Sequence, residues 1–144
     1  MKPKLLLRIA AILIAIHGIL HTIGHSGWKN APDPVEHQVI SQMTGHKFPF
    51  MGAVHSLGDY FEGYGYACSI ALVVIAILLW ITSGALETNQ TFAGKIILTI
   101  SLGLFVWAGD ELIYFFPFAA ALTFVAALCS LWSYYLLRRN APAA

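Results

Sequence analysis

Three histidines recur every four residues near the start of the chain: His17, His21 and His25, in "AIHGILHTIGHSGW". This spacing places successive side chains on one face of a helix, with a drift of about 40° per step. Two imidazoles at i and i+4 can bind one metal ion, and an imidazole can also exchange a proton near neutral pH. The spacing therefore predicts a metal site or acid/base chemistry.

Carboxylates follow in two later segments. "HSLGDYFEGYGY" carries His55, Asp59 and Glu62 at i, i+4 and i+7, which is one helical face. "WAGDELIYFFPF" carries Asp110 and Glu111 with a strongly apolar stretch still to come. Adjacent helical positions point about 100° apart, so only one of these two carboxylates can face a helix bundle directly.

The segments that hold these residues are predicted to cross a membrane. The chain has 144 residues, of which 58% are hydrophobic and 10% are charged, far below the usual charged fraction of about 25%. Four apolar stretches, about 5–28, 56–86, 95–116 and 118–137, approach the roughly 20 residues that span a bilayer as a helix. We predict an all-α membrane protein with a single four-helix transmembrane domain over residues 1–144.

The connections predict an antiparallel bundle with one long extracytoplasmic loop between helices 1 and 2. A short helix is expected in that loop after Asp33 as N-cap, followed by an apolar segment, Phe48 to Met51, that could cover the bundle. The short polar connection around Glu87 makes helices 2 and 3 antiparallel neighbours. Pro117 is expected to separate helices 3 and 4, because proline disrupts a helix interior.

Basic residues predict the orientation, because loops rich in lysine and arginine tend to stay cytoplasmic. In the four-helix arrangement, six of them fall on one side: Lys2, Lys4, Arg8, Lys95, Arg138 and Arg139. Lys29 and Lys47 fall on the other side. Both termini are therefore expected in the cytoplasm, with the protein in a bacterial inner membrane and the lipid bilayer as its surroundings. A net charge of +1 without a long basic run excludes a nucleic-acid partner.

The ionisable groups of helices 1, 2 and 3 are all expected in the outer half of the bundle. His17 lies about 18 Å along a helix that starts near Leu5, and His21 lies about 24 Å along it. A charged group costs about 2.5 to 3.5 kcal/mol at mid-bilayer, so such groups normally face a protein interior. We predict an outward-facing pocket whose core is His17, His21, Glu62 and Asp110. Its secondary members are Asp59, Glu111 and His55.

The pocket allows several functions, of which the first is a metal-binding or redox-associated site. Imidazole and carboxylate ligands suit Zn, Fe, Mn or Cu. Haem is a further possibility with His17 as axial ligand. However, two axial histidines must come from different helices at one depth, and His55 is expected too close to the surface to match His17.

Acid/base catalysis on a lipid-soluble substrate is the second possibility, as in an isomerase. Glu62 or Asp110 would act as base and His21 as acid, because burial disfavours the charged form of each group and eases proton exchange near neutrality. The third possibility is structural: hydrogen bonds between histidines and carboxylates would fix the bundle of an accessory subunit that binds a membrane protein partner.

The opening "RIAAILIAIHGILHTIG", a basic start followed by a glycine-containing first span with a His-Gly pair, resembles the DoxX-like group of small four-helix bacterial membrane proteins. "HKFPFMGAVHSLGDYFEGYGY" is similar to a stretch of related small bacterial membrane proteins. The first resemblance implies a link to membrane redox systems. The dense histidines and carboxylates of this chain depart from that group.

Overall fold

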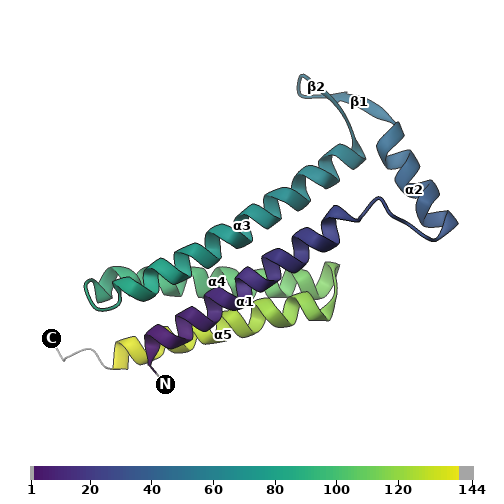
Figure 1. Ribbon diagram of the computed structural model, residues 1–144. Helices are drawn as coiled ribbons and strands as arrows, with labels where there is room; N and C mark the ends of the chain where they lie inside the picture. The colour runs from purple at the N-terminus through teal and green to yellow at the C-terminus, as the bar shows by residue number, and fades with distance from the viewer. Residues whose placement is uncertain (1, 140–144) are drawn as a thin grey trace. The chain divides into compact units, whose positions relative to one another are not determined.

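The computed structural model describes residues 2–139, which form helices and one β-hairpin (Figure 1). The helices are α1 (Pro3–Ser26), α2 (Pro34–Gly45), α3 (Leu57–Ala85), α4 (Gln90–Tyr114) and α5 (Pro117–Arg139). The strands are β1 (Lys47–Phe50) and β2 (Ala53–Ser56), which lie between α2 and α3.

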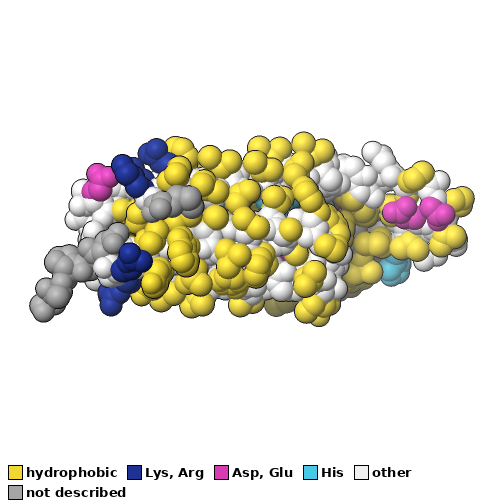
Figure 2. Space-filling model, turned by 90° about the horizontal axis from the view of Figure 1, so that it is seen from below, with side chains coloured by type: hydrophobic (Ala, Val, Ile, Leu, Met, Phe, Trp, Pro, Cys, Tyr) yellow, Lys and Arg dark blue, Asp and Glu magenta, His cyan; other side chains and the backbone are white. Residues whose placement is uncertain are grey.

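Four of the helices, α1, α3, α4 and α5, are long and apolar enough to cross a membrane. Their outer surfaces carry large apolar side chains that are more than half exposed, including Val106 at 76% and Phe118 at 62%. Figure 2 shows this apolar surface, with lysine and arginine side chains gathered at one end of the view. Such a surface is unfavourable in water and suits lipid. The prediction of four long apolar helices is confirmed, with helix boundaries that differ by a few residues.

The chain divides into two compact units. The first unit contains the residues up to His17 and those from Leu72 onward, and the second contains Gly18–Ala71. The division passes through α1 and α3, so each of these helices contributes one part to each unit.

In the first unit, two polar contacts join the start of α1 to the turn after α3 and to the C-terminal part of α5. Lys4 Nζ lies 3.1 Å from Glu87 Oε1, and Ser133 Oγ donates a hydrogen bond of 3.0 Å to the carbonyl oxygen of Pro3. α4 and α5 lie side by side, and small residues line the buried face of α5, which permits close helix packing. Pro117 is the first residue of α5, so the predicted break at this proline is confirmed.

In the second unit, the long connection contains the expected short helix. Asp33 is the N-cap of α2, and its carboxylate accepts hydrogen bonds from the backbone N–H groups of Val35 and Glu36. Pro34 occupies the first helical turn, where its missing N–H costs no helical hydrogen bond.

The segment that follows α2 differs from the expected loop, because β1 and β2 pair as an antiparallel hairpin. Phe50 lies opposite Ala53, so Met51 and Gly52 form a two-residue turn with φ values of 49° and 88°. Two positive φ angles are what a type I′ hairpin turn requires. The apolar segment from Phe48 to Met51 is therefore a strand and its turn, and Met51 at the turn is 91% exposed.

Candidate functional site

His17, Glu111 and Thr123 form a buried polar cluster in the first unit, which we call the His17 cluster. His17 Nε2 lies 3.4 Å from Glu111 Oε1, and His17 Nδ1 lies 3.0 Å from Thr123 Oγ1. The exposed fractions are 5% for His17, 4% for Glu111 and 0% for Thr123. The three residues come from α1, α4 and α5, so each of three candidate membrane spans contributes one polar side chain.

The helical geometry of α4 selects Glu111 for this cluster and directs Asp110 elsewhere. Glu111 lies on the buried face of α4, which also carries Leu104 and Ala108 at i−7 and i−3. Asp110 is exposed. The structure thus places Glu111 beside His17, whereas the sequence predicted Asp110 in the pocket core and Glu111 as a secondary member.

One oxygen of the His17 cluster has no hydrogen-bond partner among residues 2–139. Glu111 Oε1 faces His17, whereas Glu111 Oε2 is buried and unpartnered. A buried carboxyl oxygen without a hydrogen bond is costly, and it can accept a bond from another group or carry a proton itself. The cluster therefore has an unused polar atom inside a membrane-type helix unit.

The proton positions in the cluster are not fixed by its partners. The Thr123 hydroxyl can donate to His17 Nδ1 or to the carbonyl oxygen of Ala119, which lies 3.4 Å away. In the first case His17 Nε2–H can donate to a Glu111 carboxylate, and in the second a protonated Glu111 can donate to Nε2. The two arrangements differ by one bound proton, so the cluster can take up or release a proton while both side chains keep a partner.

His21 and His25 belong to the second unit, where they bind backbone atoms of α3. His21 Nε2 donates to the carbonyl oxygen of Gly65 at 3.1 Å, and His25 Nε2 donates to that of Glu62 at 3.1 Å. The two rings stack with centroids 5.9 Å apart and an interplanar angle of 1°. His25 is buried, with 9% exposure.

Gly65 makes room for this arrangement. A Cβ atom at Gly65 would overlap the His25 ring, so a residue without a side chain is required where the ring crosses α3. The edge of the His25 ring also meets Tyr66, with centroids 5.3 Å apart. His25 therefore packs as a helix-to-helix contact in the second unit.

Glu62, which the sequence placed in the pocket core, pairs with a lysine in the second unit. Lys29 Nζ donates a hydrogen bond of 2.6 Å to Glu62 Oε2. This hydrogen bond, together with the attraction of the carboxylate charge, raises the pKa of Lys29 above its ordinary value of 10.5. Glu62 thus forms an ion pair with the lysine that follows α1, and about a third of the Glu62 side chain is exposed to solvent.

The secondary candidates Asp59 and His55 lie where β2 meets α3. Asp59 Oδ2 accepts a hydrogen bond of 2.8 Å from the backbone N–H of Ser56, and Ser56 Oγ accepts one of 3.0 Å from the N–H of Asp59. This reciprocal pair is a capping box at the start of α3. His55 Nδ1 lies 3.6 Å from Asp59 Oδ2, beside an open cavity of about 350 Å³.

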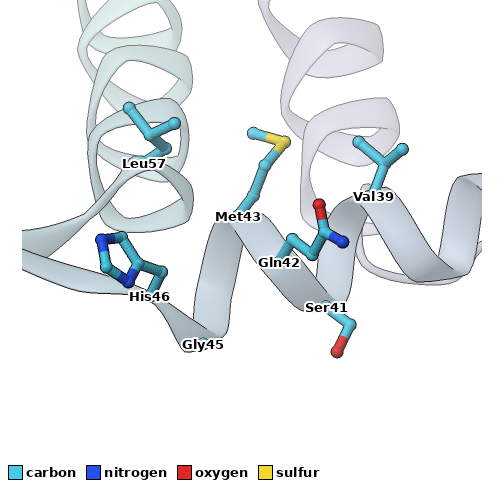
Figure 3. Close-up of a pocket in the computed structure, with 7 residues that line it drawn as sticks. All are labelled: Val39, Ser41, Gln42, Met43, Gly45, His46 and Leu57. Carbon is cyan, nitrogen blue, oxygen red and sulfur yellow. The ribbon is translucent and has the colours of Figure 1, made fainter.

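A larger open cavity, of about 640 Å³, lies beside the C-terminal end of α2 (Figure 3). In that view the Met43 side chain lies between Gln42 and Leu57, and His46 follows at the end of the helix. His46 is the one ionisable side chain among the lining residues of this cavity. The cavity shares no residue with the predicted pocket core.

A metal site finds little support in the geometry. Within residues 2–139, no group of three or more His, Cys, Asp or Glu side chains lies close enough together to hold a metal ion. His17 and Glu111 could supply two ligands, whereas His21 and His25 each use one ring nitrogen on a backbone carbonyl. Comparisons of the chain with protein-family models, with curated protein sequences and with solved structures find no match.

Thr123 is the site residue that the sequence analysis did not select. It lies on α5 in a row of small residues, with Ala119 four positions before it and Ala126, Ala127 and Ser130 after it. This helical period of small side chains is the signal that could have placed Thr123 on the buried face. The spacing of small residues does not reveal that the Thr123 hydroxyl contacts His17.

Proposed function

We propose that this protein is a membrane-embedded acid/base catalyst that acts on a lipid-soluble substrate through the His17 cluster. The observation that carries this proposal is the buried contact between His17 Nε2 and Glu111 Oε1, beside the unpartnered Glu111 Oε2. A carboxyl group and an imidazole in contact can pass a proton between them, and both are common general acids and bases. In this proposal they replace Glu62, Asp110 and His21 in the catalytic roles.

The role of each atom follows from its partner. Glu111 Oε2 would hydrogen-bond an oxygen of the substrate, Glu111 Oε1 and His17 Nε2 would share the transferred proton, and Thr123 would hold the imidazole ring through Nδ1. Burial away from water strengthens each of these interactions. A substrate that is soluble in lipid could reach the cluster from the bilayer.

A purely structural role is the alternative, and the second unit supplies a reason to consider it. His21 and His25 hydrogen-bond to backbone carbonyls of α3, which is a packing function. The His17 cluster differs because Glu111, which lies beside His17 Nε2, can itself gain or lose a proton. An accessory subunit would be expected if the cluster keeps one protonation state at all pH values.

For the whole chain we propose an antiparallel bundle across the membrane, with both termini in the cytoplasm and the connection between α1 and α3 outside. The contacts of Lys4 with Glu87 and of Arg8 with the Trp80 ring support an antiparallel α1 and α3. All lysines and arginines except Lys29 and Lys47 belong to the first unit, which supports the orientation.

The test of the acid/base proposal is infrared difference spectroscopy of the full-length protein in detergent, titrated between about pH 4 and pH 9. This range includes the ordinary pKa values of carboxyl and imidazole groups, about 4.3 and about 6.5. We expect a carboxylic acid band that changes with pH, disappears in Glu111→Gln and shifts in His17→Ala. Asp110→Asn is the matched control, because Asp110 is exposed, and it should keep the band.

A band that does not change over this pH range would show that the cluster holds one proton state and would overturn the proposal in favour of a structural role. Elemental analysis of the same preparation adds an independent check. Stoichiometric Zn, Fe, Mn or Cu that is lost in His17→Ala would instead favour the metal site.

A further inference from the structure

A cavity of about 260 Å³ lies in the first unit between the start of α4 and the end of α5. Its polar lining includes Gln90, Lys95 and Arg138, and its apolar lining includes Leu98 and Leu137. The cavity is therefore cationic on one side and apolar on the other. It shares no residue with the His17 cluster.

No ion pair among the described residues neutralises the cationic lining. The side chains of Lys95 and Arg138 are exposed, and neither forms an ion pair within residues 2–139. Glu87, the acidic residue in the turn before α4, is paired with Lys4 at 3.1 Å. Two unpaired positive charges thus line one small cavity, where a ligand with a negative charge would be favoured.

The apolar side is formed where α4 and α5 pack closely. A Cβ atom at Gly94 would lie 3.6 Å from the Tyr134 ring and 3.7 Å from Leu137, which is ordinary contact distance. Leu137 itself is buried, with 6% exposure. The cavity therefore has a packed apolar lining in addition to its charged side chains.

We infer that this cavity binds the head group of an anionic phospholipid. Its place at the ends of two candidate membrane spans is where head groups meet a membrane protein, and basic pockets between such helices suit lipid phosphates. Lys95 and Arg138 would bind the phosphate, Gln90 would hydrogen-bond the glycerol part, and Leu98 would contact the start of an acyl chain. The inference does not depend on the chemistry of the His17 cluster.

The test is a native mass spectrometry titration of the full-length, detergent-purified protein with phosphatidylglycerol, phosphatidylcholine or inorganic phosphate. We expect phosphatidylglycerol to bind more tightly than phosphatidylcholine. The double variant K95Q/R138Q should lose about 30-fold in apparent affinity for phosphatidylglycerol, or about five-fold for each charge removed. The charge-conserving K95R/R138K should keep most of the affinity.

Arg139→Gln is the matched control, because Arg139 is exposed and adjacent to Arg138 but does not line the cavity. If Arg139→Gln weakens binding as much as the double variant, the attraction is diffuse and the proposed site is wrong. Equal affinity of K95Q/R138Q and the unchanged protein would also overturn it, as would full competition by inorganic phosphate. If the double variant does not fold by circular dichroism, the single variant K95Q and its five-fold loss decide the question.

Discussion

His17 faces a carboxylate and a hydroxyl, whereas His21 and His25 face backbone carbonyls. A carbonyl oxygen can only accept, so Nε2 of His21 and His25 must carry hydrogen in every state that keeps these bonds. A carboxyl group can accept or donate, so either His17 Nε2 or Glu111 can carry the hydrogen in their contact. The chemistry of the partner therefore separates one histidine suited to proton exchange from two suited to packing.

The hydroxyl of Thr123 should contribute to stability through His17. Thr123→Val keeps the side-chain shape but removes the group that faces His17 Nδ1, and we expect the free energy of unfolding to fall by about 1 kcal/mol. Equilibrium unfolding in mixed micelles measures this change.

Ser130→Ala is the matched control for Thr123→Val. Ser130 Oγ is buried on the same helix and lacks a hydrogen-bond partner among the described residues. Its removal should be neutral or stabilising by up to about 1 kcal/mol, because an unsatisfied buried hydroxyl is lost. A Thr123→Val variant as stable as Ser130→Ala would contradict the assigned bond to His17.

The ion pair of Lys29 and Glu62 should show itself in the titration of the lysine. The pKa of Lys29 is raised above 10.5 by the hydrogen bond to Glu62, so its stabilising effect is complete below pH 10.5 and is lost as the pH rises through the higher folded-state value. In Glu62→Gln we expect the Lys29 pKa to fall, as followed by NMR of the side-chain amine. An unchanged value in this variant would mean that the pair does not form in solution.

The choice between Asp110 and Glu111 marks the limit of what could be predicted for single residues. Helical geometry established that only one of the two carboxylates faces the interior. To predict which one, the position of α4 relative to His17 and Thr123 must be known. That position depends on the packing of Ala108 and Leu104, which a pattern of charges does not reveal.

At the level of secondary structure, the helices were predictable because their signals are long or local. Continuous apolar stretches predicted the four long helices, and Asp33 and Pro117 marked two helix starts. The hairpin was missed because its two strands have only four residues each and because β1 contains Pro49, which is unusual inside a strand. In addition, Met51 in the turn adopts a positive φ that usually requires glycine or asparagine.

The crossing of α1 and α3 in the second unit should depend on Gly65. Gly65→Ala places a methyl group where the His25 ring lies, so we expect a loss of about 1 to 3 kcal/mol in unfolding free energy and a changed environment of the His25 ring. Thermal unfolding in detergent and NMR of the imidazole measure the two effects.

Gly63→Ala, two residues earlier on α3, controls for the loss of a glycine. A Cβ at Gly63 meets nothing within 4 Å. This variant should be neutral or slightly stabilising, by up to about 1 kcal/mol, because alanine favours a helix more than glycine does. If both variants unfold alike, the contact between His25 and Gly65 does not determine the packing.

For the whole molecule, the distribution of lysine and arginine residues between the two units predicts the membrane topology. Six basic residues belong to the first unit, and Lys29 and Lys47 belong to the second. The first unit also contains the turn between α3 and α4, which includes Thr88, and the second contains the connection after α1, which includes Asn30. The rule that lysine and arginine loops stay cytoplasmic then predicts that Thr88 lies inside the cell and Asn30 outside.

Single cysteines in a background with Cys68 and Cys129 replaced by alanine test this topology. A membrane-impermeant maleimide added to intact spheroplasts should label Asn30→Cys at once, whereas Thr88→Cys should react only after the membrane is permeabilised. Arg139→Cys at the end of α5 should behave like Thr88→Cys, because both lie at the basic end of the first unit. Labelling of Asn30→Cys and Thr88→Cys from the same side would require an even number of crossings between them. It would contradict an arrangement in which α1, α3, α4 and α5 all span the bilayer, since α3 is the one long helix between these two positions.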